Sequence, residues 1–213
     1  MNHLERIKQK LDHLRQVDTR RTIFGAESHQ YLLNPCLSEW QIRSFEQSYA
    51  IHLPDDYRSF LQAIGNGGAG PYYGIIPLEQ SLRDWCREED PLYPSKEFPL
   101  HTSLELYTLG SGADFDRYMI SYYTQGTIDI CDYGCAIYFM LVVNGSEKGS
   151  IWVDDRASDG GIFALTQRIG QHRHVDFLTW YENWLDKSIQ AVQGVKLDSE
   201  YGYLEYGLAE PDN

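Results

Sequence analysis

The chain lacks the features that mark secreted and membrane proteins. It has only four cysteines in 213 residues and no CxxC pair, which argues against a disulfide-rich small domain. Its first ten residues, MNHLERIKQK, are polar and charged rather than apolar, unlike a secretory signal. The longest apolar run, residues 136–143, falls far short of the roughly 18 residues that span a bilayer. We therefore expect a cytoplasmic protein that does not insert into membranes.

The common enzyme motifs are also missing. There is no GxxxxGK[ST], HExxH or GxSxG pattern. The glycines at 67, 68 and 70 follow a helical pattern, so they indicate a helix end rather than a phosphate cradle. We predict that the protein has no catalytic residues and no cofactor.

A zinc site is the one metal centre that the sequence could suggest. Four potential zinc ligands are present: Cys131, Cys135, His172 and His174. The C-x₃-C spacing is borderline for structural zinc, and the two histidines lie far from the cysteines along the chain. We therefore predict that there is no metal, and that Cys131 and Cys135 are buried free thiols in a β segment.

Negative charge dominates the chain. The formal net charge is −13, although residues 1–21 carry six Lys/Arg against three Asp/Glu, so the remainder carries −16. An acidic body repels phosphate backbones and anionic membrane surfaces, which argues against direct nucleic-acid or membrane binding. It attracts a basic protein partner, unless the acidity serves only to keep the protein in solution.

Three groups of side chains are candidates for contacting such a partner. They are an acidic group in the middle of the chain, acids that follow a predicted strand, and tyrosines in the acidic tail: Asp84, Glu88, Glu89 and Asp90; Asp154, Asp155 and Asp159; Tyr203 and Tyr206. The second group could instead be catalytic or form a turn, since Asp is a common turn residue. The tail tyrosines could anchor an interface or fold back on the domain.

Apolar spacing predicts four helices. The first is at the N-terminus, with a stripe of Leu4, Ile7, Leu11 and Leu14. After an irregular linker over residues 22–35, Ser38 and Gln41 form a capping box for a second helix, whose stripe is Ile42, Phe45 and Tyr49. Residues 53–56 open a third helix, which carries Tyr57, Phe60, Leu61 and Ile64. The last helix covers residues 175–192 and buries Trp184.

Between the helices lie short β patterns. We predict strands at residues 73–78, 118–123, 127–130, 138–143 and 151–153, with residues 144–149 as a long hairpin turn. The run at 138–143 should be a buried inner strand, and Trp152 should be a core residue. Helices, then strands, then a helix indicate an α+β fold with a single antiparallel, or mixed, sheet flanked by helices from both ends of the chain.

An ordered set of motifs runs through the middle of the chain. It begins with SEWQIRSFE at residue 38, IHLPDDYRSFL at 51 and NGG at 66, and continues with YGIIPL at 73. LVVNG at 141, GSIWVDD at 149, GIFAL at 161 and FLTWYENWL at 177 complete it. This set resembles the SUKH superfamily, which includes fungal cell-wall assembly regulators and bacterial immunity proteins. The match divides the chain into an N-terminal helix and linker (1–37), a SUKH-like domain (38–192) and an acidic aromatic tail (193–213).

The resemblance implies an α+β domain without catalytic residues. It implies a protein that binds and neutralises a cognate polymorphic toxin, with a basic nuclease or deaminase as the partner. A regulatory or scaffold protein related to the cell-wall assembly regulators is the alternative, and an enzyme of unrecognised type is the third hypothesis.

Overall fold

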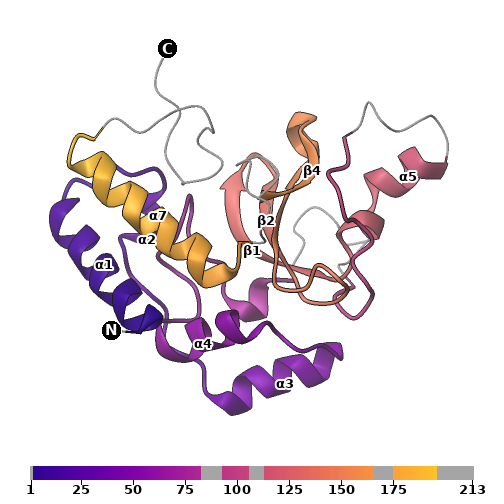
Figure 1. The fold of residues 1–213 in the computed structure, drawn as a ribbon, viewed down its shortest axis with the longest axis horizontal. Helices are drawn as coiled ribbons and strands as arrows, with labels where there is room; N and C mark the ends of the chain where they lie inside the picture. The colour runs from indigo at the N-terminus through magenta and orange to yellow at the C-terminus, as the bar shows by residue number, and fades with distance from the viewer. Residues whose placement is uncertain (1, 83–92, 106–112, 166–174, 196–213) are drawn as a thin grey trace.

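The computed structural model describes residues 2–82, 93–105, 113–165 and 175–195. Its centre is a four-stranded antiparallel sheet in the order β1-β2-β3-β4 (Figure 1). The strands are β1 Thr127–Gly134, β2 Ile137–Val142, β3 Ile151–Asp155 and β4 Gly161–Ala164. Helices lie on both sides of this sheet, which confirms the predicted α+β class.

The helices come from both ends of the chain, with short ones between them. The longer helices are α1 His3–Val17, α3 Glu39–Tyr49, α4 Asp55–Ala63 and α7 Phe177–Val192. The short ones are α2 Ala26–His29, α5 Ala113–Met119, η1 Leu78–Gln80, η3 Ser121–Thr124 and η4 Arg156–Ser158.

Strand β2 is buried on both faces of the sheet. Phe139 and Leu141 join the main core, where Phe139 stacks on Trp180 of α7 with ring centroids 5.6 Å apart. Met140 and Val142 point to the opposite face and join a second, smaller core. The predicted inner strand is therefore confirmed, and its uninterrupted apolar run follows from burial on both sides.

The two tryptophans predicted to be buried are both fully buried, in different cores. Trp184 belongs to the main core under α7, and Trp152 belongs to the second core. Phe98 packs against Trp152 edge-to-face with ring centroids 4.8 Å apart, and the Trp152 indole N–H donates to the Ser150 hydroxyl at 3.0 Å. The prediction that both are core residues is therefore confirmed.

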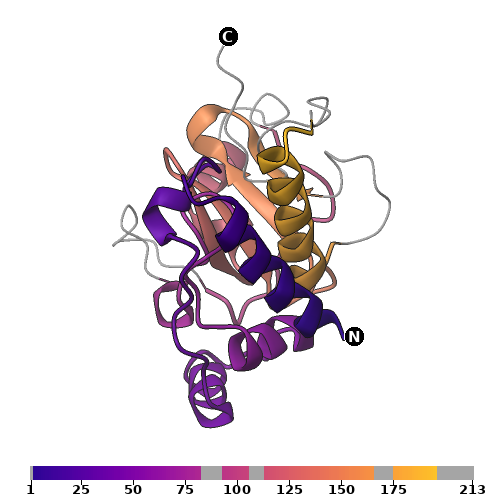
Figure 2. The same cartoon turned by 90° about the vertical axis from the view of Figure 1, so that its left-hand side faces the viewer.

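Helices α1 and α7 lie side by side in both views (Figures 1 and 2). Arg6 of α1 lies 2.9 Å from Glu182 of α7, and Lys10 lies 2.7 Å from Asp186. Both partners advance by four residues, so the two helices run in the same direction. The apolar side of α1 joins the main core through the buried residues Ile7, Leu11 and Leu14.

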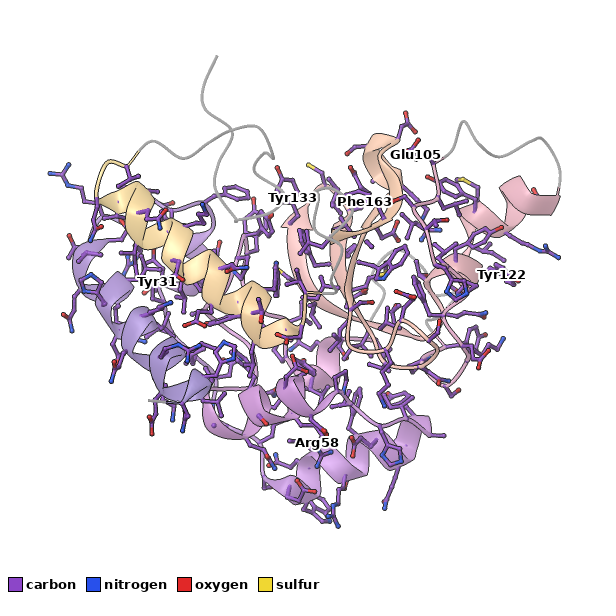
Figure 3. All side chains as sticks on the ribbon, in the orientation of Figure 1. Tyr31, Arg58, Glu105, Tyr122, Tyr133 and Phe163 are labelled. Atoms are coloured by element: carbon purple, nitrogen blue, oxygen red, sulfur yellow. The ribbon has the colours of Figure 1, made fainter. Side chains whose placement is uncertain are left out.

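The predicted linker over residues 22–35 contains α2 and a buried tyrosine. Tyr31, labelled between α1 and α7 in Figure 3, is 1% exposed. Its hydroxyl donates to Asp18 at 2.5 Å, and Asp18 also accepts the Thr22 N–H at 2.8 Å. This segment is irregular, as predicted, and the Asp18–Tyr31 bond fixes it to the core.

The starts of α3 and α4 agree with the sequence. The Ser38 side chain accepts the Gln41 N–H, and the Gln41 side chain accepts the Ser38 N–H, which is the predicted capping box. Pro54 stands directly before α4, where its missing N–H removes no helical bond. The stripe assigned to α3 was wrong at Tyr49, which is 42% exposed.

Two predicted strands are not strands. Residues 118–123 were wrong: they run through the end of α5 into η3, and the Tyr118 and Ile120 carbonyls accept from Arg156 rather than from a neighbouring strand. Residues 73–78 make isolated bridges at Ile75 instead of a strand. Gly74 there has φ +100°, and Pro77 has no N–H, so the pairing cannot extend.

Candidate functional site

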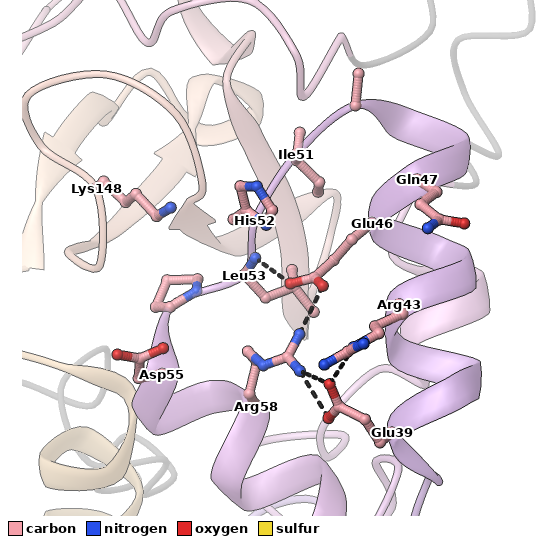
Figure 4. Close-up of a pocket in the computed structure, with 12 residues that line it drawn as sticks. Glu39, Arg43, Glu46, Gln47, Ile51, His52, Leu53, Asp55, Arg58 and Lys148 are labelled. Atoms are coloured by element: carbon pink, nitrogen blue, oxygen red, sulfur yellow. Dashed lines mark hydrogen bonds and ion pairs between the residues drawn. The ribbon is translucent and has the colours of Figure 1, made fainter.

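A pocket of about 780 Å³ opens between α3 and the segment that leads into α4 (Figure 4). Helix α3 lines one wall with Glu39, Arg43, Glu46 and Gln47. Residues 50–55 and Arg58 line a second wall, and Lys148, from the loop between β2 and β3, stands across the pocket. Segments far apart in the sequence therefore build it.

Arg58 is the centre of an ion-pair network beside the pocket. Its guanidinium lies between α3 and α4, where Nη2 donates to the two Glu39 oxygens at 2.8 and 2.7 Å and Nη1 lies 2.6 Å from Glu46 (Figures 3 and 4). The pKa of Arg58 lies above its usual value, mainly because of the hydrogen bond to Glu46. The arginine therefore stays charged and holds the two helices together.

Glu46 is the buried member of this network, with 6% of its surface exposed. One carboxylate oxygen pairs with Arg58, and the other accepts the Leu53 N–H at 2.8 Å. Glu46 comes four residues after buried Ile42, so it lies on the inward side of α3. The four-residue spacing from Ile42 is the sequence signal that Glu46 is buried. The prediction considered only the apolar stripe of Ile42, Phe45 and Tyr49, so it missed Glu46.

Glu39 forms the outer part of the network. Its side chain is 44% exposed and accepts from Arg43 Nε at 2.6 Å and from Gln62 Nε2 at 2.7 Å. The hydrogen bond from Arg43 is the largest cause that lowers the pKa of Glu39. Glu39 is therefore ionised at neutral pH and engaged by three donors.

The charges that line the pocket cancel. The acids are Glu39, Glu46 and Asp55, and the permanent cations are Arg43, Arg58 and Lys148. Acid–base or nucleophilic catalysis needs a proton-transfer group aimed at a substrate, whereas Glu39 and Glu46 are committed to arginines. No group of three or more His, Cys, Asp or Glu side chains in the described residues could hold a metal ion.

Of the acids predicted to follow the strand at 151–153, two are the last residues of β3 and lie inside the protein. Asp154 is 3% exposed and pairs with Arg156 at 2.6 Å, and Asp155 is 8% exposed. Gly160 packs directly on Asp155, because a Cβ at position 160 would lie 2.0 Å from an Asp155 carboxylate oxygen. The turn interpretation was therefore wrong at Asp154 and Asp155; the turn comes after them, and Asp159 in it is exposed.

The other predicted contact residues lie outside the described residues. They are Asp84, Glu88, Glu89 and Asp90 in the middle of the chain, and Tyr203 and Tyr206 in the tail. The predicted pair of buried thiols was half right. Cys131 is fully buried, but Cys135 is exposed in the β1–β2 turn with φ +52°. Burial raises the pKa of the Cys131 thiol well above its usual value.

The structure is that of an α+β protein with a charge-balanced pocket between α3 and the start of α4. A family model assigns the class more closely: residues 36–168 match the SMI1 / KNR4 family (SUKH-1). The match covers more than half of the chain, which therefore belongs to this family. Members of the family are in general non-catalytic and engage in protein–protein interaction.

Helices α1 and α7 lie outside the matched residues, although both contribute to the main core. Comparisons with curated proteins and with solved structures gave no significant match. Within the described residues, no helix is both long enough and apolar enough to cross a bilayer.

Proposed function

We propose that this chain is a cytoplasmic, non-catalytic immunity protein that binds and neutralises a cognate polymorphic toxin. Membership of the SMI1 / KNR4 family carries the proposal, since that family fits an immunity role. The pocket between α3 and α4 supports a binding role, because two of its carboxylates, Glu39 and Glu46, are engaged by arginines rather than held ready for proton transfer.

The partner in this proposal is a basic protein. A toxin that acts on nucleic acid attracts phosphates, so its active face is basic, and a chain of net charge −13 attracts it in turn. Asp159, the acids at 84 and 88–90, and Tyr203 with Tyr206 remain the proposed contacts. The burial of Asp154 and Asp155 at the end of β3 supports a structural role for these two carboxylates.

The test begins with the gene beside this one, which the proposal expects to encode a toxin. Cells that express the toxin should survive only when this chain is co-expressed, and the purified proteins should form a stable complex. Association should slow steeply as salt rises, because charges at the rim of an interface mainly set the on-rate. Reversing Asp159, or the acids at 84 and 88–90, to Lys should slow it further.

Glu27→Lys is the matched control, since Glu27 is an exposed acid on α2 and belongs to none of these groups. Failure to rescue growth would contradict the immunity role. An on-rate that is the same at low and high salt and in every charge-reversal variant would contradict the electrostatic argument. Several partners without any toxicity would favour the second candidate function, a regulatory or scaffold protein, which the same family membership also fits.

A further inference from the structure

Trp40 of α3 lies almost entirely in solvent. It is 75% exposed, more than any other large apolar side chain in the described residues. At 100° per residue it points about 160° away from Ile42, which is fully buried on the same helix. Both ribbon views place α3 at the lower edge of the molecule (Figures 1 and 2). The indole therefore projects outward from the body of the protein.

The surface around Trp40 carries no net charge. Ser44 and Gln47, four and seven residues further on, share its side of the helix and are uncharged. Glu39 and Arg43, the charged residues beside Trp40 on α3, form an ion pair at 2.6 Å. Gln47 also lines the pocket, whose acids and permanent cations balance. An exposed tryptophan on a surface without net charge is suited to the centre of a protein interface.

This surface carries no net charge, although the chain as a whole carries −13. Two copies of such a chain repel each other through their net charge, because like charges raise the free energy of association. They meet no such net repulsion at α3 and its pocket. The same surface also carries both a projecting indole and a hollow, so it is complementary to itself, as the contact in a two-fold dimer must be.

We propose that α3 and the pocket form the contact between two copies of this chain, with the two α3 helices antiparallel and each Trp40 indole in the pocket of the other copy. Trp40 lies in the first turn of α3, and Gln47 is roughly 10 Å further along the helix at 1.5 Å per residue. An antiparallel pair centred between residues 43 and 44 sets Trp40 opposite Gln47 of the second copy.

The pocket can hold the indole. A volume of about 780 Å³ lies within the range of pockets that enclose drug-sized ligands, which are larger than an indole. Ile51, Leu53 and Pro54 supply apolar lining, and the stem of Lys148 can cover the ring. Burying an aromatic side chain of this size at low entropic cost makes Trp40 the anchor of the dimer.

Sedimentation equilibrium of the full-length chain, up to about 1 mM, tests this association. The wild-type protein should form a dimer whose population rises with concentration. Trp40→Ala should weaken it about tenfold or more, as truncation of an anchoring tryptophan does. Leu32→Ala is the matched control: Leu32 is 59% exposed and lies outside α3, so this variant should dimerise like the wild type.

A second variant, at a residue that lines the pocket, tests the same contact without changing Trp40. Gln47→Glu keeps the size of an exposed side chain and adds one negative charge per copy to the contact, so it should also weaken the dimer. Thermal melting of each variant checks the fold. A wild-type chain that stays monomeric, or a dimer unchanged by Trp40→Ala, would overturn the proposal. A dimer weakened by Trp40→Ala but not by Gln47→Glu would overturn the antiparallel arrangement. Growth rescue in the toxin assay does not depend on these outcomes.

Discussion

Asp154 and Arg156 form a forked ion pair at the end of β3. Arg156 Nε donates to Asp154 Oδ1 at 2.7 Å, and Nη2 donates to Oδ2 at 2.6 Å. The third nitrogen, Nη1, donates to the main-chain carbonyls of Tyr118 and Ile120. The pair therefore ties the end of β3 to the junction between α5 and η3.

Asp154→Asn should lower the free energy of unfolding by about 3 kcal/mol. The substitution keeps the shape of the side chain but leaves the Arg156 guanidinium, only 11% exposed, without its counter-charge. Urea denaturation monitored by tryptophan fluorescence measures the change. Asp159→Asn is the control, because Asp159 is exposed and Asn also tolerates its left-handed backbone at φ +61°. Equal stability of the two variants would show that the fork contributes little.

The sequence located this acidic turn but could not show that Asp154 is buried. Asp and Gly after a strand are local turn signals, but β3 runs on through Asp155, two residues past the predicted end at 153, before the turn begins. The carbonyls that Arg156 caps come from residues 118 and 120, in a segment whose aromatic composition imitates a strand. Local sequence patterns do not show that a distant side chain donates to these carbonyls. The sequence therefore predicted neither the burial of Asp154 nor the absence of a strand at residues 118–123.

Glu46→Ala should destabilise the protein far more than Glu39→Ala. Glu46 is 6% exposed, and its loss removes the partner of Arg58 and the acceptor of the Leu53 N–H, for an expected cost of about 3 kcal/mol. Glu39 lies at the surface, where water replaces its contacts. Paired urea denaturation curves give the difference. Similar small effects for both substitutions would mean that the α3–α4 network is not a structural lock.

Local signals predicted the walls of the pocket, but not the pocket itself. The capping box at Ser38 and Pro54 before α4 fixed where α3 and α4 begin. The pocket also needs Lys148, from a loop almost one hundred residues later, and the pairing of Arg58 with both glutamates. Contacts of this kind depend on tertiary packing, which periodicity and capping do not encode.

Leu11→Ala should cost about 2–5 kcal/mol of unfolding free energy. Leu11 is 2% exposed on α1 and belongs to the main core, so the change leaves a cavity. Unfolding should remain a single transition, because α1 and α7 share this core. Lys8→Ala, at an exposed position of the same helix, is the control. Unchanged stability of Leu11→Ala would indicate that the N-terminal helix folds apart from the family domain.

Stability should fall between pH 7 and pH 5 because of His29. Its ring is buried, its Nδ1 accepts the Tyr31 N–H at 3.1 Å, and it meets Trp184 edge-to-face. Burial lowers the pKa of His29 from 6.5 to about 4. Between these values the unfolded chain binds the proton and the folded chain does not, so stability is full above about pH 6.5 and is lost as the pH falls toward 4.

At pH 5 the expected loss is about 2 kcal/mol relative to pH 7, at 1.36 kcal/mol per pH unit. Glu182, whose pKa of about 2 lies below its usual 4.5, loses its contribution only at lower pH and does not enter this range. Urea denaturation at the two pH values measures the difference. It should largely vanish in His29→Gln and persist in the control His52→Gln, since His52 is exposed. If His29→Gln retained the full difference, another group would have to bind the proton, and the buried imidazole would not be the cause.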